Sequence, residues 1–367
     1  AELLARMGFR VERHPVPEAD VKAQGLASIT NLVVRRRFGD GPVIALNVHG
    51  DVVPPGSGWT HPPYAGDIAD GRMYGRGVAV SKADIATYAY ALRALAAVAD
   101  VTHGSVELHI TYDEEFGGKL GPEWLLARNI TRPDLALCPG FSYEVGVAHN
   151  GCVQLEVILH GRAAHAAMPA SGIDAMRAAN VVLDCLYRYA DQLRRTHSKV
   201  TGIDSPTLVV GRIDGGINTN VVPDRVSLRL DRRVIPEERA VDVEYALRAH
   251  IESLALALPG ITVEIRRLLR ARPLVPLAGN AALVAALTRH ARTFIGEDIP
   301  ARGTPLYTDA RLYGERGVPT VLYGAGPRTV LESNAKRADE NLLLEDLRRA
   351  TKVVACALRD LLQPAAV

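Results

Sequence analysis

Residues 43–51 have the sequence VIALNVHGD, and this stretch decides the fold. Its first part, Val43–Val48, is a nearly continuous apolar run, which is typical of a parallel strand buried on both faces. His49, Gly50 and Asp51 follow directly, so polar groups stand at the carboxyl end of the predicted strand. Open α/β sheets bind their ligands at such ends, and we therefore look for a site there.

The next segments alternate between helix and strand patterns. Apolar residues at helical spacing predict a helix over 82–98, and strict alternation predicts a strand over 106–110. Pro122 suits the first turn of a second helix, and the short apolar run 135–137 predicts a further strand. This βαβ order predicts an α/β domain.

The pattern changes after Cys152. We expect an alternating strand, a helix, two strands, a helix and a strand, at residues 153–159, 173–194, 208–213, 226–230, 237–256 and 261–265. This βαββαβ order predicts a small two-layer, ferredoxin-like domain. The α/β pattern then returns, with a helix over 281–294, a strand over 318–323 and a final helix over 342–362. The sequence thus predicts a split α/β domain (1–151 and 269–367) with residues 152–268 inserted.

Composition narrows the class of protein. At ~150 residues per domain, 367 residues suggest about two domains. The net charge of 43 − 41 = +2 disfavours a nucleic-acid protein built on a basic surface. Four cysteines without a CxxC pair favour a reducing compartment, and we expect a cytoplasmic protein. The first residues lack a signal-peptide pattern, and no apolar run reaches the ~18 residues of a membrane span.

Three polar clusters follow predicted strands: 49–51, 113–115 and the loop around Cys138. A histidine with a carboxylate two residues later suits a metal ligand and the group that orients it. Adjacent glutamates, Glu114 and Glu115, repel unless a cation or proton lies between them. One suits a general base and the other a ligand. The alternative is that His49 caps its strand and the acids are solvated.

Segments along nearly the whole chain resemble the di-zinc aminoacylase/carboxypeptidase metallopeptidase family, which includes acetylornithine deacetylase, succinyl-diaminopimelate desuccinylase, aminoacylase and carboxypeptidase G. The resemblance rests on motifs in the family's order: NVHGDVVPPGSGW, YGRGVAVSKAD, ITYDEEFGG, HGRAAHAAMPASGIDA, GGINTNVVPD with DRRVIP, GTPLYTDARLYGERGVPTVLYGAG and RADE. It implies a lid and dimerisation role for the inserted domain and a homodimer. It also implies hydrolysis of an amide-type bond in a small carboxylate, such as an N-acyl amino acid or a dipeptide-like compound.

The resemblance assigns roles at the strand ends. It places the first zinc-binding histidine on His49, with Asp51 as its orienting carboxylate. It places the general base on Glu114 and the neighbouring metal ligand on Glu115.

Three family ligand positions are changed. Val80 stands where the family has its bridging aspartate, Cys138 where it has the second glutamate, and Lys336 where it has the last histidine. A shift of the alignment does not restore the set, because the last histidine of the chain is His290 and Asp84 lies one helical turn beyond Val80. No glutamate lies within five residues of Cys138.

These changes imply at most one divalent metal per chain, zinc by preference, or none. His49, Glu115 and Cys138 would suffice for one site, because catalytic zinc takes three protein ligands and water. The alternative for Cys138 is a small buried apolar residue. Lys336 would lie beside Glu115 and supply a fixed positive charge in place of the metal.

The substrate-side motifs are intact. The resemblance implies that His165 reaches across a dimer to the oxyanion that develops on the substrate in the partner's active site. It also implies that Asn220 and Arg233 hold the substrate, and that the turn with Gly324 and Gly326 lets the substrate approach the backbone. The alternatives are a surface histidine at 165 and an ordinary ion pair at Arg233.

Two functions remain open. The first is a hydrolase in which Glu114 activates water, with His165 and a residual metal or Lys336 stabilising the oxyanion. The second is a zinc-free relative that binds a small carboxylate or runs altered chemistry. Both act on small molecules, and we expect neither a nucleic-acid partner nor a membrane.

Overall fold

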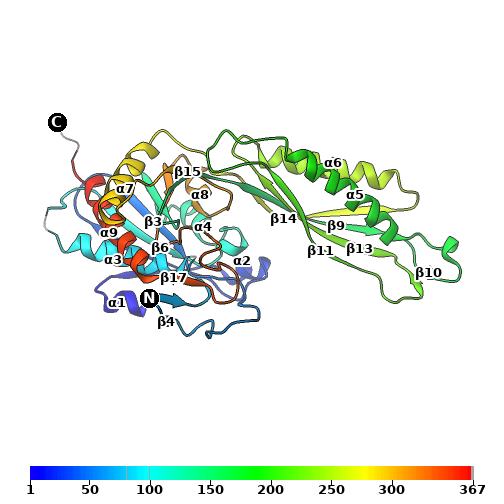
Figure 1. Ribbon diagram of the computed structural model, residues 1–367, viewed down its shortest axis with the longest axis horizontal. Coiled ribbons are helices and arrows are strands. Elements are labelled where there is room, and N and C mark those ends of the chain that lie inside the picture. Colours follow the sequence, from blue (N-terminus) through cyan, green and yellow to red (C-terminus); the bar gives the residue numbers. More distant parts are fainter. Residues whose placement is uncertain (80, 99, 365–367) are drawn as a thin grey trace. The chain divides into compact units, whose positions relative to one another are not determined.

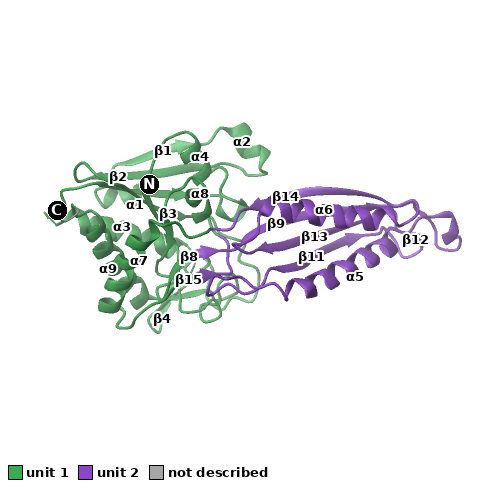
Figure 2. Cartoon of the chain, turned by 90° about the horizontal axis from the view of Figure 1, so that it is seen from above, with its two compact units in different colours: residues 1–147, 275–302, 308–367 green, residues 148–274, 303–307 purple. Residues whose placement is uncertain are grey.

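The computed structural model describes residues 1–79, 81–98 and 100–364 (Figure 1). The chain forms two compact units, coloured separately in Figure 2. The first comprises Ala1–Val147, Val275–Arg302 and Thr308–Val367, and the second Ala148–Leu274 and Gly303–Tyr307. The predicted domain borders, 151/152 and 268/269, lie a few residues from these edges. The chain leaves the first unit and returns to it, as expected for a split domain.

The described chain has one large sheet of eight strands, in the order β1-β2-β6-β3-β7-β16-β8-β15. Its strands are β1 (Val11–Pro15), β2 (Thr30–Arg37), β3 (Val43–His49), β6 (Ser105–Thr111), β7 (Leu135–Cys138), β8 (Val145–His149), β15 (Ala301–Thr304) and β16 (Thr320–Leu322). β3 runs parallel to β6 and β7, and Ile44, Leu46 and Val48 are fully buried. The predicted buried parallel strand is therefore confirmed, and its carboxyl end carries His49.

The helices of the first unit are α1 (Glu2–Arg6), α2 (Glu18–Ala23), α3 (Lys82–Ala96), α4 (Pro122–Ala127), α7 (Asn280–Phe294), α8 (Ala310–Gly314) and α9 (Leu344–Leu361), with the 3-10 turn η1 (Glu114–Phe116). α3, α7 and α9 pack together on the sheet through buried side chains such as Leu92, Leu287 and Val353. None of the described helices is long and apolar enough to cross a membrane.

The final helix starts later than the sequence pattern predicts. Leu342 lies in β17 (Asn341–Leu343), which pairs with β5 (Arg72–Tyr74), and β5 pairs in turn with β4 (Asp67–Ala69). Leu342 is 1% exposed and lies opposite Met73. A buried leucine at this position fits the apolar pattern of a helix as well as a place in this small sheet, so the sequence pattern did not distinguish a strand from the start of the helix.

The second unit has a four-stranded antiparallel sheet with the order β11-β13-β9-β14. Along the chain it contains β9 (Gly151–His160), β10 (Ala164–His165), η2 (Pro169–Ser171), α5 (Ala175–Leu193), β11 (Thr207–Gly215), β12 (Val221–Val222), β13 (Arg225–Val234), α6 (Ala240–Leu256) and β14 (Thr262–Ala271). The order β9-α5-β11-β13-α6-β14 confirms the predicted ferredoxin-like fold. β14 extends past the predicted 265 because it pairs with β9 along its whole length, with a register shift after Arg267.

Candidate active site

His49 and Asp51 connect the end of β3 to the turn that carries the glutamates. The His49 ring is 5% exposed, and its Nδ1 lies 3.1 Å from the Asp51 backbone oxygen and 3.3 Å from Asp51 Oδ1. Asp51 Oδ2 accepts a hydrogen bond of 3.0 Å from the backbone N–H of Glu115. Asp51 thus contacts both the histidine and the glutamate turn.

Glu114 is the first residue of η1, three positions after β6 ends at Thr111. The turn ends at Gly117, whose φ of 101° lies in the left-handed region that favours glycine. Glu114 is 8% exposed, and its Oε2 lies 3.8 Å from His49 Nε2. The structure therefore brings the two predicted residues to one buried place.

Burial controls the charge of this pair. It raises the pKa of Glu114 to about 7; the positive charge of His49 opposes this rise and the negative charge of Glu115 adds to it. For His49, burial favours a lower pKa, but the hydrogen bond to Asp51 and the charges of Glu114 and Asp51 outweigh burial and raise it to about 9. A cationic imidazolium thus lies beside a carboxylate that can exchange a proton near neutrality.

Lys336 lies on Glu115. Its Nζ donates to Glu115 Oε2 at 2.8 Å. The Lys336 backbone has a φ of 62°, and its N–H donates to Glu340 Oε2 at 3.3 Å. Glu340 is 2% exposed and also accepts hydrogen bonds from the Arg76 side chain and from the backbone N–H groups of Gly77 and Ala79. A buried ion pair therefore holds the loop that presents the lysine.

Cys138 ends β7 and is 1% exposed. Burial, and to a lesser degree the charge of Asp309, raises the pKa of its thiol well above the ordinary value. Because zinc binds thiolate, a neutral buried thiol supports the interpretation of Cys138 as a small apolar residue.

The described donors do not fit the two-metal site that the family resemblance implies. Within residues 1–79, 81–98 and 100–364, no group of three or more His, Cys, Asp or Glu is arranged to hold a metal ion. The Lys336 ammonium instead contacts Glu115. The changed position Val80 lies outside the described residues.

The predicted glycine turn is packed against its own unit. Asp84 is 2% exposed, and its Oδ1 accepts a hydrogen bond of 2.7 Å from the backbone N–H of Ala325. A Cβ on Gly324 would lie 2.1 Å from that oxygen, and one on Gly326 would lie 2.6 Å from the Gly140 backbone oxygen. Close packing therefore requires both glycines, and a role in substrate approach stays a prediction.

Sequence reasoning missed Asp309, the residue before α8. It is 3% exposed, and neither carboxylate oxygen has a hydrogen-bond partner among the described residues. Burial and the nearby charges of Glu114 and Asp113 raise its pKa well above the ordinary value. Its signal was the TDAR sequence, which the family resemblance contained without assigning it a role.

In the second unit, His165 and Asn220 lie together and Arg233 lies elsewhere. His165 in β10 pairs with Val221 in β12, and the Asn220 backbone oxygen accepts a hydrogen bond of 2.9 Å from Ala166. Arg233 is near the opposite end of β13, where its Nε donates to Asp231 Oδ1 at 2.8 Å. This ion pair matches the alternative interpretation of Arg233.

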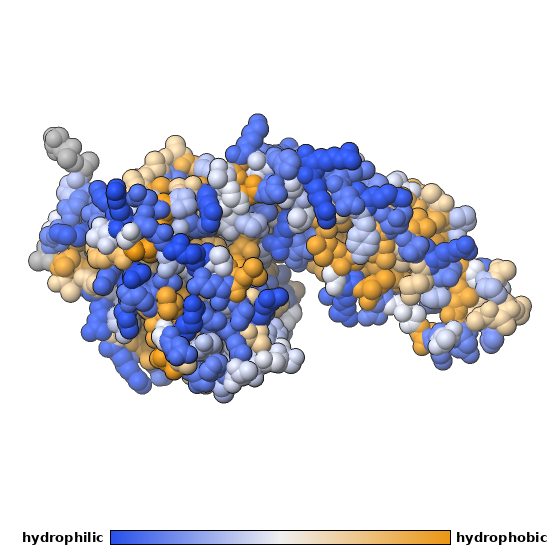
Figure 3. All heavy atoms as spheres, in the orientation of Figure 1, coloured by the Kyte–Doolittle hydropathy of each residue, from blue (hydrophilic) through white to orange (hydrophobic). Residues whose placement is uncertain are grey.

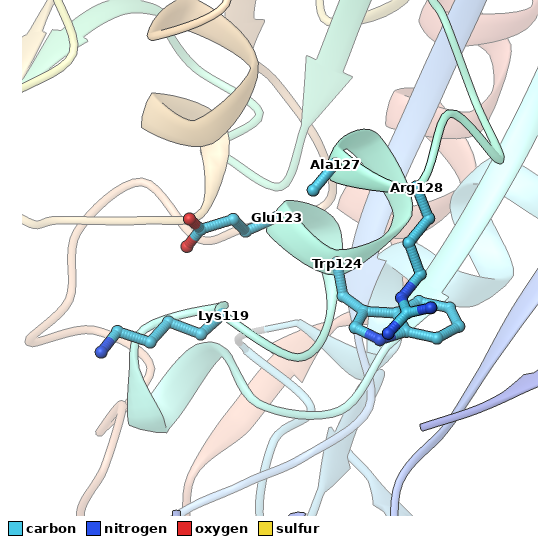
Figure 4. A pocket seen from close by; sticks show the side chains of 5 residues that line it. All are labelled: Lys119, Glu123, Trp124, Ala127 and Arg128. Carbon is cyan, nitrogen blue, oxygen red and sulfur yellow. The ribbon is translucent and has the colours of Figure 1, made fainter. Parts of the chain in front are cut away.

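A pocket lies on α4, and none of the residues that line it is a predicted site residue. It has a volume of about 410 Å³ and is lined by Lys119, Glu123, Trp124, Ala127 and Arg128. Figure 4 shows the Arg128 guanidinium over the Trp124 ring, 4.7 Å from its centre. Exposed charged side chains around one aromatic ring do not by themselves define a ligand.

The fold is thus a split α/β unit with an inserted ferredoxin-like unit, and a buried glutamate and histidine lie together at the strand ends of the first. The chain belongs to peptidase family M20/M25/M40, whose model matches residues 45–360. This confirms the family resemblance and makes the chain a member of a hydrolase family.

Known proteins agree with this assignment. Succinyl-diaminopimelate desuccinylase of Marinobacter nauticus is 27% identical over 339 residues, which cover 89% of this chain and 85% of that protein. The fold is that of the M20 family metallo-carboxypeptidase Sso-CP2 of Sulfolobus solfataricus (TM-score 0.79, 16% identity, 98% and 92% covered). It is also that of the Bacillus subtilis YXEP protein, described as a dinuclear metal-binding peptidase (TM-score 0.66, 16% identity, 98% and 90% covered).

Proposed function

We propose that the protein hydrolyses an amide-type bond of a small carboxylate, an N-acyl amino acid or a dipeptide-like compound, with Glu114 as general base. The observation that carries the proposal is the buried Glu114 beside His49, with a pKa of about 7. A general base works best when its pKa lies near the working pH. Family membership and the desuccinylase relatives support the reaction class.

The reaction needs two proton transfers through Glu114 and one stabilised negative charge. Glu114 takes a proton from water, the water oxygen bonds to the amide carbon, and the Glu114 proton then passes to the leaving nitrogen as the C–N bond breaks. Positive charge near the developing oxyanion lowers the barrier, and His49 and Lys336 supply it in this unit. Asp51 keeps His49 oriented.

The second unit supplies the proposed substrate contacts. We propose that it acts as the lid and dimerisation domain, that His165 stabilises the oxyanion in a homodimer, and that Asn220 and Arg233 bind polar groups of the substrate. Arginine suits a carboxylate because its two N–H groups match the two oxygens.

We further propose that Lys336 takes the place of metal charge at Glu115. The chain then holds at most one divalent metal, and no step above is assigned to a metal. The contact between Lys336 and Glu115 at 2.8 Å supports this proposal.

The test offers the protein a panel of N-acetyl and N-succinyl amino acids and dipeptides and measures hydrolysis by the release of free amine. We expect turnover by the wild type and a loss of at least ~10²-fold in Glu114→Gln, because general-base catalysis contributes that much. Glu123→Gln, at an exposed glutamate of α4, is the matched control. Equal rates for Glu114→Gln and the wild type would overturn the role of Glu114.

A second candidate function is binding of a small carboxylate without hydrolysis. The ion pair of Lys336 with Glu115 favours it, because that pair engages a glutamate which the family resemblance assigns to metal. Calorimetric binding of N-acyl amino acids that stay intact on prolonged incubation would select this function over the first.

A further inference from the structure

A chain of hydrogen-bonded polar side chains runs from β2 to α8 in the first unit, and it is buried from Glu107 to Tyr313. Arg35 donates to Glu107. Glu107 Oε2 accepts from the Thr131 hydroxyl and lies 3.0 Å from His109 Nε2. His109 Nδ1 lies 2.9 Å from the Tyr313 hydroxyl. A carboxylate only accepts, so His109 Nε2 donates to Glu107, and the other ring nitrogen hydrogen-bonds with the Tyr313 hydroxyl.

This chain of hydrogen bonds ends on α8, a helix that is too short to be stable without contacts to the rest of the unit. α8 has five residues, far fewer than a helix needs for stability on its own. Tyr313 and His109 are fully buried, so their hydrogen bond fixes α8 to the central strand β6. The chain is thus an anchor inside the unit, and solvent does not reach its centre.

α8 in turn contacts the turn that carries the proposed base. Arg311 is 5% exposed, and its Nη2 donates to the Gly117 backbone oxygen at 2.7 Å. Its Nη1 donates to Glu315 at 3.2 Å. Asp309 packs on Gly118 so closely that a Cβ there would lie 2.1 Å from Asp309 Oδ1.

The glutamate turn is therefore held from two sides. Asp51 accepts the Glu115 backbone N–H at 3.0 Å on one side, and Arg311 binds the Gly117 carbonyl on the other. We propose that Arg311 is a positioning residue for Glu114 and Glu115, and that the chain Tyr313–His109–Glu107 fixes the helix that presents it. The catalytic consequence rests on the proposed function, whereas the positioning itself does not.

Hydrogen exchange of the Glu115 amide measures the positioning without any substrate. In Arg311→Met the guanidinium is lost, and we expect this amide to exchange at least ~10-fold faster, the equivalent of one hydrogen bond to a charged group. Glu315→Gln is the matched control, because it removes the ion pair of Arg311 and leaves the bond to Gly117. It should leave the exchange unchanged.

Activity then separates positioning from folding. We expect Arg311→Met to lower kcat ~10²-fold with little change in KM, because a misplacement of about 1 Å has that effect. Arg311→Lys should recover part of the loss, and Tyr313→Phe, which removes one hydroxyl, should give a smaller effect in the same direction.

The outcomes are distinct. Unchanged Glu115 exchange in a folded Arg311→Met or Tyr313→Phe variant overturns the positioning role, whatever the activity. Faster exchange in a protein whose wild type hydrolyses nothing supports the positioning and overturns the proposed hydrolysis. If Arg311→Met does not fold, Arg311→Lys and Tyr313→Phe decide the question by the same two measurements.

Discussion

At the scale of single residues, Lys336 has an exposed side chain whose ammonium group contacts Glu115. Its side chain is 59% exposed, whereas that of Glu115 is 16% exposed. The Lys336 Nζ and Glu115 Oε2 atoms lie 2.8 Å apart. Two unit charges at that distance attract by about 6 kcal/mol at an effective dielectric constant near 20, but solvent screening at an exposed lysine reduces the net value to ~1 kcal/mol. The pair therefore contributes little to stability, and its importance lies in the proposal that the ammonium takes the place of metal charge at Glu115.

Metal content tests this interpretation. We expect the wild type to retain fewer than two zinc ions per chain after dialysis, and Val80→Asp, Cys138→Glu and Lys336→His together to increase retention by restoring family ligand positions. Elemental analysis measures both. Two tightly held zinc ions in the wild type, with no gain in the triple variant, would show that Lys336 does not replace metal.

Glu107 carries a pH-dependent share of stability. Burial favours a higher pKa for this carboxyl, but His109, Thr131 and Arg35 outweigh burial and lower it. A lowered folded-state pKa contributes stability above the ordinary glutamate pKa, and this contribution is lost as the pH falls through the folded-state pKa.

We therefore expect Glu107→Gln to reduce the unfolding free energy by about 1–3 kcal/mol at neutral pH and by less in acid. Urea unfolding at a series of pH values measures the difference. Glu12→Gln, at the more exposed partner of Arg35, is the control, with an expected effect below ~1 kcal/mol. A pH-independent loss in Glu107→Gln would contradict the role of its charge.

Some residues of the site followed from the sequence and others did not. His49 ends β3 and Glu114 follows the neighbouring parallel strand β6, so their proximity was predictable from strand order alone. Asp309 precedes a five-residue helix without periodicity and Arg311 lies on it, and their burial depends on contacts with Gly117 and Gly118. No local pattern encodes such contacts.

At the scale of elements, local signals predicted the long helices best. α5 begins where Asp174 accepts hydrogen bonds from Met176 N–H at 2.9 Å and Arg177 N–H at 3.1 Å. Aspartate at this position satisfies donors that the first helical turn leaves open. The edge strand β1 and its neighbour β2 were missed, because their charged residues obscure the alternation.

The cap gives a prediction for the second unit. Asp174→Ala should reduce the unfolding free energy by about 1 kcal/mol, and Asp174→Asn, which keeps the acceptor oxygen, by much less. Thermal unfolding followed by circular dichroism compares the two. Equal losses in both variants would assign the effect to the charge of Asp174 and not to its hydrogen bonds.

At the scale of the whole molecule, the sequence predicted the split domain because the order of elements changes twice along the chain. βαβ order on both sides of a βαββαβ block leaves few other topologies. The assembly of subunits is a different matter, since it depends on surfaces. Figure 3 shows hydrophobic atoms exposed over the second unit.

We propose that the edge strand β11 carries a homodimer contact. It lies at one end of its sheet, and Val209 and Ile213 are 55% and 51% exposed. An exposed apolar edge strand pairs readily with another chain, and a two-fold contact is the commonest way to close such an assembly. Proteins protect such edges with charge, so a lysine at each position should oppose pairing.

We therefore expect the wild type to be a dimer in light scattering at micromolar concentration, and Val209→Lys with Ile213→Lys to be a folded monomer. Arg212→Lys on the same strand keeps its charge and should remain dimeric. If His165 acts in a partner's site, the monomeric variant should also lose hydrolysis while Glu114 and Lys336 stay in place. A monomeric wild type that retains full activity would remove both the dimer and the catalytic role of His165.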